Sequence, residues 1–238
     1  MIDLHSHVLP GLDDGAPDES ASLAMCRMAA EDGIRTLVAT PHFDAVLGVC
    51  DRDVIARTAD RLRQCLAEEQ IELTLGFAAE MPLTEYAVEL YRSGTWPAYD
   101  AGRNYVLLEV PPIRNGFPIL REMVFQLRMA GATPVLAHPE RLEMLDDVQA
   151  VEDLRMQGAV LQITAGCLTA PSTSARKRAI KWLRRGWVHL VASDAHNLSS
   201  RPPCLSPARQ WLQEQFGAEV ADALTRGNPE KILRGEPL

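Results

Sequence analysis

The chain has 238 residues, of which 47% are hydrophobic and 24% are charged, as is typical of one large α/β domain or two small ones. Its net charge of −8 argues against general nucleic-acid binding, and no apolar run approaches the ~20 residues of a membrane-spanning helix. The N-terminus lacks a signal-peptide pattern and the five cysteines have no framework spacing, so we expect a cytoplasmic protein with reduced thiols.

Seven short apolar segments alternate with segments of helical periodicity along the whole chain. Strands are predicted at Met1–Leu4, Ile34–Ala39, Ile71–Phe77, Tyr105–Val110, Thr133–Ala137, Val160–Thr164 and Val188–Ala192. Helices are predicted at Asp18–Asp32, Arg52–Glu69, Thr84–Tyr91, Phe117–Ala130, Asp147–Gln157, Ser174–Arg185, Pro207–Phe216 and Glu219–Thr225. No linker or repeat interrupts this alternation, which predicts parallel β/α units in a single domain over residues 1–238.

The first fifteen residues, MIDLHSHVLPGLDDG, hold a dense group of candidate metal ligands. His5 and His7 are two residues apart, so both imidazoles point the same way in an extended chain. Asp13 and Asp14 follow in a turn that is rich in Pro and Gly. Two imidazoles with nearby carboxylates suit a borderline divalent metal, although this stretch alone could also be a polar loop with two surface histidines.

Further ligand-type side chains recur where the predicted strands end. They are His5 and His7, His42, Glu80, Glu109, His138, and Asp194 with His196, on six of the seven strands. The sixth strand, in QITAG, ends without one. Because the carboxyl ends of parallel strands share one face, these residues predict one site with enough ligands for two or three metals. Glu109, inside YVLLEVP, is expected to be buried, and His189, inside VHLVAS, is interpreted as a core histidine or a support for a ligand.

The segments DLHSHVLPGLDDG, ATPHF, LLE, AHPER and ASDAHN, with the Glu80 segment, resemble the motif series of the PHP (polymerase and histidinol phosphatase) superfamily. The DDG and PER motifs, and SDAHNLSSRPP followed by NPEKI, are similar to bacterial tyrosine-protein phosphatases of capsule and exopolysaccharide loci, the CpsB/CapC type. The resemblance covers nearly the whole chain and implies a distorted seven-stranded PHP-type β/α barrel. Two loops, 46–51 and 111–117, depart from the family pattern and leave the substrate detail open.

The resemblance also implies a trinuclear metal centre with a complete ligand set. The implied ligands are His5, His7, Glu80 and Asp194 for the first metal, Glu80, Glu109 and His138 for the second, and Asp14, His42 and His196 for the third. Two or three divalent transition-metal ions are therefore expected, with manganese preferred and iron or zinc as alternatives.

The activity that the resemblance implies is hydrolysis of phosphotyrosine by a metal-activated hydroxide. The implied substrate is the tyrosine-rich tail of a bacterial tyrosine kinase that controls capsule or exopolysaccharide synthesis. Arg141 and Arg201 follow ligands on two different strands, and the resemblance assigns both to phosphate binding. A planar guanidinium suits this role because it can bind two phosphate oxygens at once. Asp194 or His196 is a candidate to protonate the leaving tyrosinate.

Other interpretations of these residues predict different functions. A cysteine-based tyrosine phosphatase is excluded, because it needs Arg six positions after its cysteine and none of the five cysteines has one. A histidinol-phosphate or other small phosphomonoester phosphatase of the same superfamily stays open, since the metal cluster would be the same. A non-catalytic metal-binding module is disfavoured by the complete ligand set. The basic run from Arg176 to Arg185 is interpreted as a solvated helix face.

Overall fold

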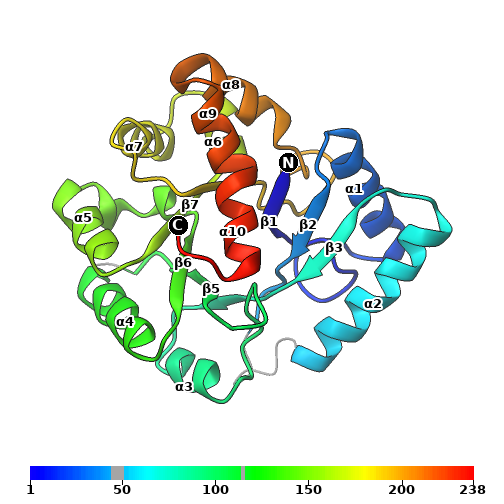
Figure 1. The fold of residues 1–238 in the computed structure, drawn as a ribbon, viewed down its shortest axis with the longest axis horizontal. Coiled ribbons are helices and arrows are strands. Elements are labelled where there is room, and N and C mark those ends of the chain that lie inside the picture. The colour runs from blue at the N-terminus through cyan, green and yellow to red at the C-terminus, as the bar shows by residue number, and fades with distance from the viewer. Residues whose placement is uncertain (44–50, 114–115) are drawn as a thin grey trace.

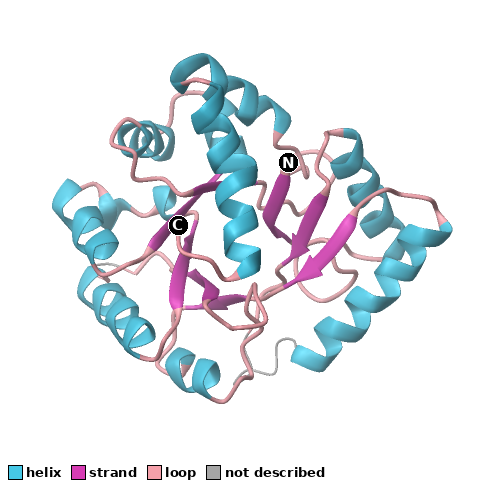
Figure 2. Ribbon diagram, in the orientation of Figure 1, coloured by secondary structure: helices cyan, strands magenta, loops and turns pink. Residues whose placement is uncertain are grey.

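The computed structural model describes residues 1–43, 51–113 and 116–238. In these residues the strands form a ring of parallel pairs, with most of the helices packed around its outside (Figure 1). Figure 2 shows the strands at the centre of the molecule and the helices around them. Cys50 and parts of the two divergent loops, 46–50 and 114–115, lie outside the described residues.

The strands belong to two sheets that together close the barrel. The first sheet contains β1 (Ile2–Ser6), β2 (Thr36–Ala39) and β3 (Thr74–Phe77). The second contains β4 (Glu80–Pro82), β5 (Tyr105–Glu109), β6 (Thr133–Ala137), β7 (Val160–Thr164) and β8 (Leu190–Ala192). Isolated bridges from His42 to Glu80 and from Ser6 to Ala195 join the sheets at both seams.

The strand ladder breaks just after the third predicted strand. The Ala78 N–H donates to the Ala39 carbonyl, but the Ala79 N–H turns away to the Pro97 carbonyl at 3.2 Å. The ladder therefore stops between β3 and β4, and Glu80 begins a strand instead of following one. Counting β3 and β4 as one broken strand, the barrel has the seven strands that the sequence predicts.

The predicted helices are present, with small differences at their ends. The observed helices are α1 (Glu19–Glu31), α2 (Arg52–Glu68), α3 (Ala87–Arg92), α4 (Phe117–Met129), α5 (Val148–Met156), α6 (Ala165–Thr169), α7 (Ser174–Leu183), α8 (Ser206–Phe216), α9 (Ala218–Asp222) and α10 (Asn228–Arg234). Asp18 and Asp147, predicted as helical, are instead N-caps whose carboxylates accept backbone N–H groups of the first turn.

Several bounds and elements of the prediction are wrong. β2 and β3 begin two and three residues later than predicted, and β4 was not predicted. The last strand begins at Leu190, two residues later than predicted, so His189 lies just before it. The short helix α6 follows β7 directly and was not predicted, because five residues are too few for a periodic pattern. The predicted end at Thr225 is passed by a π-helical turn (Ala223–Gly227) and by α10.

Apolar side chains fill the barrel interior at the amino-terminal end of the strands. Leu4, Leu107, Val135 and Leu190 point inward and pack with Ile232 of α10, and all five are fully buried. In Figure 1, α10 lies across this end of the strands, close to both chain termini. The carboxyl ends of the strands therefore form the opposite face, which is where the candidate ligands lie. No helix in the described ranges is long and apolar enough to cross a membrane.

Candidate metal centre

The structure brings all nine predicted metal ligands together at the carboxyl ends of the strands. Donor atoms within 4.8 Å of one another form four overlapping groups: His7, Asp14, His42 and His196; His5, Glu80 and His138; His5, His7 and Asp194; and His42, Glu80 and Glu109. Six of the seven strand positions contribute, as the sequence predicts. The cluster is therefore a product of barrel closure, since its members are spread from the first strand to the last.

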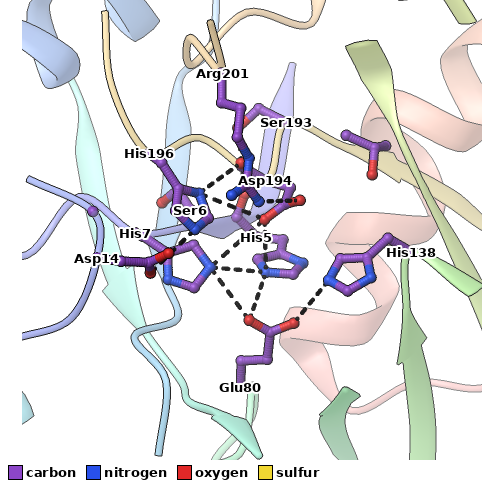
Figure 3. Close-up of polar contacts among 12 residues, drawn as sticks. His5, Ser6, His7, Asp14, Glu80, His138, Ser193, Asp194, His196 and Arg201 are labelled. Carbon is purple, nitrogen blue, oxygen red and sulfur yellow. Dashed lines mark hydrogen bonds and ion pairs between the residues drawn. The ribbon is translucent and has the colours of Figure 1, made fainter. Parts of the chain in front are cut away.

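The Glu80 carboxylate faces several imidazoles of the cluster at once, and Figure 3 shows it pointing at them from below. Its Oε2 atom is 3.2 Å from His5 Nε2 and 3.3 Å from His7 Nε2. Its Oε1 atom is 3.2 Å from His138 Nε2. Because the two carboxylate oxygens face different imidazoles, this fully buried side chain has the geometry of a bridge between two cations.

The unpaired atoms of the cluster fit divalent metal ions. Both oxygens of Glu80 and the Oδ1 atom of Asp194 are buried without a hydrogen-bond partner in the described residues. The Nε2 atoms of His5 and His7 face each other at 3.2 Å, where two lone pairs would repel. A cation among these imidazoles and carboxylates relieves both problems, and this donor set suits a borderline transition metal.

The electrostatics of the cluster also favour positive charge. Burial lowers the pKa of His7, but the hydrogen bond with Asp13 and the nearby negative charges of Asp13 and Glu80 outweigh burial and raise that pKa to about 10. Burial raises the pKa of Glu80, yet the surrounding imidazoles hold it well below its usual range. The carboxylates therefore stay ionised, and their negative charge favours the protonated form of the neighbouring imidazoles. A bound metal ion would take the place of that proton.

Two residues outside the predicted ligand set orient the first two histidines. His7 Nδ1 lies 2.7 Å from Asp13 Oδ2, and the same carboxylate accepts the His42 N–H at 3.1 Å. His5 Nδ1 lies 2.9 Å from the amide oxygen of Gln162. Each contact leaves the Nε2 atom directed at the cluster. Gln162 belongs to β7, the strand without a predicted ligand, and its only sequence signal is a polar residue inside the apolar run VLQIT.

An unusual backbone conformation orients the side chains of two further candidate ligands. His138 has a φ of 34° and Asp194 a φ of 55°, both in the left-handed region that residues other than glycine rarely adopt. His138 follows β6 directly and Asp194 is the second residue after β8, where its N–H donates to the His5 carbonyl at 2.9 Å. Such conformations persist where the surrounding structure imposes them, and they are enriched at functional sites.

The two arginines expected to bind phosphate converge on one oxygen of Asp194. Arg141 Nη2 is 2.5 Å and Arg201 Nη2 is 2.6 Å from Asp194 Oδ2. Burial raises the pKa of Asp194, but His5, His138 and both guanidinium groups together hold it far below its usual range. The Asp194 side chain is 1% exposed, whereas the Arg141 and Arg201 side chains are 42% and 36% exposed. Both guanidinium groups therefore remain open to an incoming anion.

The grouping of the ligands differs in part from the sets that the resemblance implies. Glu109 groups with His42 and Glu80, whereas His138 groups with Glu80 and His5. The Glu109 side chain is 29% exposed, so the expectation of a buried carboxylate is wrong; Glu109 ends β5 at the open face. The division of the ligands among individual metals stays a proposal.

His189 lies apart from the cluster, at the amino end of the strands. Its Nδ1 atom accepts the Leu161 N–H at 3.0 Å, so the imidazole takes the place of a backbone carbonyl in the sheet. Burial, with a smaller effect of Arg155, lowers the pKa of His189 to about 4. A neutral imidazole with a structural hydrogen bond agrees with its interpretation as a core histidine.

The fold and the centre together define a β/α-barrel protein with a cluster of candidate metal ligands at the carboxyl ends of its strands. The phosphotriesterase homology protein from Escherichia coli shares this fold, with a TM-score of 0.59 at 11% identity over 97% of each chain. Residues 1–234 match the family described as "Capsular polysaccharide synthesis, CpsB/CapC". The chain belongs to the CpsB/CapC family.

Relatives match over nearly the full length of the chain. The tyrosine-protein phosphatase YwqE of Bacillus subtilis is 34% identical over 242 residues, covering 100% of this chain and 93% of the relative. The tyrosine-protein phosphatase CpsB of Streptococcus pneumoniae is 31% identical over 240 residues, 98% of each. The crystal structures of these two proteins are described as those of unique metal-dependent tyrosine phosphatases. One matches with a TM-score of 0.91 at 30% identity, covering 100% of this chain and 96% of the other.

Proposed function

We propose that this chain is a metal-dependent tyrosine-protein phosphatase whose metal centre is built around Glu80. The proposal rests on one observation: two kinds of functional group lie together at the carboxyl-end face of the barrel. A buried cluster of imidazoles and carboxylates suits divalent metals, and beside it two half-exposed arginines suit a phosphate. In a member of the CpsB/CapC family whose relatives are named tyrosine-protein phosphatases, this combination supports hydrolysis of a phosphorylated tyrosine.

The metal-binding residues are proposed in the three sets that the family pattern implies, with Glu80 between the first two. Divalent metal ions held by these residues would lower the pKa of a bound water from about 15.7 toward about 7 and would neutralise charge on the phosphoryl oxygens. We propose two or three transition-metal ions, with manganese preferred over iron or zinc. Asp13 and Gln162 keep the His7 and His5 rings turned toward them.

Arg141 and Arg201 are proposed to bind the phosphate oxygens that are not attacked. Asp194 Oδ2 holds one nitrogen of each guanidinium, so the remaining N–H groups are aimed without further ordering. Guanidinium groups at the position where negative charge develops stabilise the transition state more than they stabilise the bound substrate. Asp194 thereby links the metal cluster, through Oδ1, to the phosphate-binding arginines, through Oδ2.

Asp194 and His196 remain the candidates for assisting the leaving tyrosinate. Burial, His7 and Arg201 lower the pKa of His196 to about 4, and the pKa of Asp194 is lower still. Both groups are therefore largely deprotonated at neutral pH and seldom carry a proton to donate. The leaving group requires little assistance, because a phenol has a pKa of about 10.

The proposed substrate is a phosphotyrosine-containing protein, and more specifically the tyrosine-rich tail of a bacterial tyrosine kinase. The family description, capsular polysaccharide synthesis, and the names of the relatives support this choice. The half-exposed arginines are also accessible to a side chain carried on a polypeptide.

Metal removal and substrate comparison together test the proposal. Chelation should abolish hydrolysis of a phosphotyrosine peptide, and manganese should restore it better than magnesium, which prefers oxygen ligands. Histidinol phosphate should be a poor substrate of the same preparation. Full activity of the metal-free protein would contradict the proposed chemistry, and a preference for histidinol phosphate would contradict the proposed substrate.

A cysteine-free variant separates this chemistry from a thiol mechanism. Burial raises the pKa of Cys26 and of Cys167 to about 12, which keeps both thiols protonated and unreactive. Replacing all five cysteines of the chain with Ser or Ala should leave a folded product active. Loss of turnover with metal content and fold intact would instead implicate a thiol.

A further inference from the structure

The barrel face opens beside β7, the strand that ends without a metal ligand. The residues after this strand are small, and they line a cavity of about 630 Å³ between α6 and the starts of α7 and α8. This volume is in the usual range of ligand pockets, about 300–1,000 Å³. The apolar part of the lining includes Gly166, Ala170, Ala175, Pro202 and Pro207.

The cavity is continuous with the phosphate-binding residues. Arg141 and Arg201 both line it, as does Ser193, the neighbour of Asp194. A second cavity of about 860 Å³ is also lined by Arg141 but not by Arg201. A phosphate held by both arginines is therefore at the edge of the first cavity.

We propose that this cavity, the aryl pocket, binds the phenyl ring of phosphotyrosine and selects aryl over alkyl phosphates. The inference rests on the proposed function, which places the phosphate between the metal ligands and the two arginines. In phosphoryl transfer the attacking and leaving oxygens lie roughly in line. With attack from the side of the ligand cluster, the leaving oxygen and its ring point away from the cluster and past the guanidinium groups.

The chemistry of the walls matches a flat apolar ring. Pro202 and Pro207 offer apolar surface to its faces, and the guanidinium groups of Arg141 and Arg201 offer cations to its π-system. A serine or threonine phosphate has no group that reaches this surface. The pocket thus favours the aryl ester by burial of the ring, while the metals and arginines act on any phosphate.

Buried hydrogen bonds hold one wall in place. The fully buried Glu140 accepts the Thr164 N–H through Oε1 at 2.9 Å, and its carbonyl accepts Arg178 Nε at 2.7 Å. Thr164 Oγ1 in turn accepts Arg141 Nη2 at 3.3 Å. The pocket wall and one phosphate-binding arginine are therefore connected, so the aryl pocket is formed before the substrate binds.

Gly166 provides a direct way to fill the pocket. A Cβ atom at this position would meet no atom within 4 Å, and no positive φ prevents a side chain there. Gly166→Leu therefore places an isobutyl group in the space proposed for the ring. Ala170→Leu places the same group in this space from a residue with extended backbone just after α6. This variant replaces Gly166→Leu in the test if Gly166→Leu is unstable. Gly227→Leu is the matched control, a helical glycine outside the pocket whose nearest neighbour to a Cβ is 3.9 Å away.

The test compares binding of phenylphosphonate and methylphosphonate to the manganese-loaded full chain by calorimetry. Phenylphosphonate should bind more tightly to the wild type and to Gly227→Leu. In Gly166→Leu and Ala170→Leu the ratio of the two dissociation constants should shift against phenylphosphonate by about 10- to 200-fold, the scale of small steric changes in apolar pockets. An unchanged ratio in both pocket variants would overturn the aryl pocket.

Failure of the proposed function would give a different result. If the wild type hydrolysed another phosphomonoester and no phosphotyrosine peptide, the function would be wrong. The binding ratio is measured without turnover, so it would still report whether the pocket recognises an aryl group. If phosphotyrosine were hydrolysed but the ratio of the two dissociation constants were the same in the wild type and in both pocket variants, only the proposal of the aryl pocket would be wrong.

Discussion

Arg141 and Arg201 donate to the same oxygen of Asp194, at 2.5 Å and 2.6 Å, although they follow two different strands of the barrel. The other oxygen of Asp194 faces the Nε2 atom of His5 at 3.4 Å. One buried carboxylate therefore sets the position of the two guanidinium groups, proposed to bind phosphate, relative to the candidate metal ligands. Residues that act through this arrangement can be separated experimentally from those that bind metal.

The first prediction concerns the two arginines. A guanidinium stays protonated and has no lone pair for a metal, so Arg141→Ala and Arg201→Ala should keep near-normal metal content and fold. Each should lose about 2–4 kcal/mol of transition-state stabilisation, or about 30- to 1000-fold in rate. Lysine should restore only part of the rate, because it keeps the charge without the two-pronged geometry. Kinetics on a phosphotyrosine peptide and metal analysis of the same samples provide the measurement.

An exposed arginine gives the control for these variants. Arg226 pairs with Asp222 on the surface and its side chain is 60% exposed, so Arg226→Ala should retain the wild-type rate. Wild-type hydrolysis by both Arg141→Ala and Arg201→Ala would move the phosphate site elsewhere.

The second prediction concerns the central carboxylate. Glu80→Gln keeps the shape of the side chain but removes the charge that four nearby imidazoles face. We expect a lower metal content and a large loss of rate, because the bridging position needs two anionic oxygens. Glu69→Gln, at a carboxylate that is 52% exposed, should change neither quantity. Metal content and a rate equal to wild type in Glu80→Gln would refute the bridging role.

The third prediction concerns the residues that orient the histidines. Asp13→Asn and Gln162→Ala remove or weaken the partners of His7 Nδ1 and His5 Nδ1. Loss of such a partner commonly lowers metal affinity about 10- to 100-fold, and we expect this range for each variant. Titration of the metal-free protein with manganese measures it. Asp18→Asn is the control, because Asn caps the start of α1 as well as Asp does; equal affinities in all four proteins would exclude an orienting role.

The fourth prediction concerns His189 and pH. Burial lowers its pKa from 6.5 to about 4, so the unfolded chain takes up a proton at a higher pH than the folded protein does. The stability due to neutral His189 is therefore present above pH 6.5 and is lost as pH falls toward 4. Between pH 7 and pH 5 the wild type should lose about 2 kcal/mol more than His189→Gln, whose amide oxygen can still accept the Leu161 N–H.

Urea unfolding of the metal-free proteins at both pH values measures this difference. Removing the metal from both proteins avoids the separate effect of metal release at low pH. The histidines of the metal centre titrate in both proteins, so their effect cancels in the comparison. Parallel loss of stability in the wild type and His189→Gln would show that His189 is not the titrating group.

The sequence by itself was enough to predict that the candidate ligands lie at one face of the barrel. His42 and His138 follow apolar β-strands, and parallel strands in β/α units must present their carboxyl ends on one face. The location of the cluster follows from this rule without any side-chain geometry. The same reasoning predicted β6 and β7 at their observed bounds, because each is a short apolar run between clear turn signals.

Only the tertiary structure decided how these residues meet. Gln162 contacts His5 across 157 positions of sequence, and Arg141 contacts Asp194 across 53, and neither contact has a local signature. The left-handed backbone of Asp194 and the break before Glu80 depend on hydrogen bonds with distant segments. Local sequence patterns indicate on which face of its own strand a side chain lies. Distances between strands depend on how the barrel closes, and that is set by packing over the whole chain.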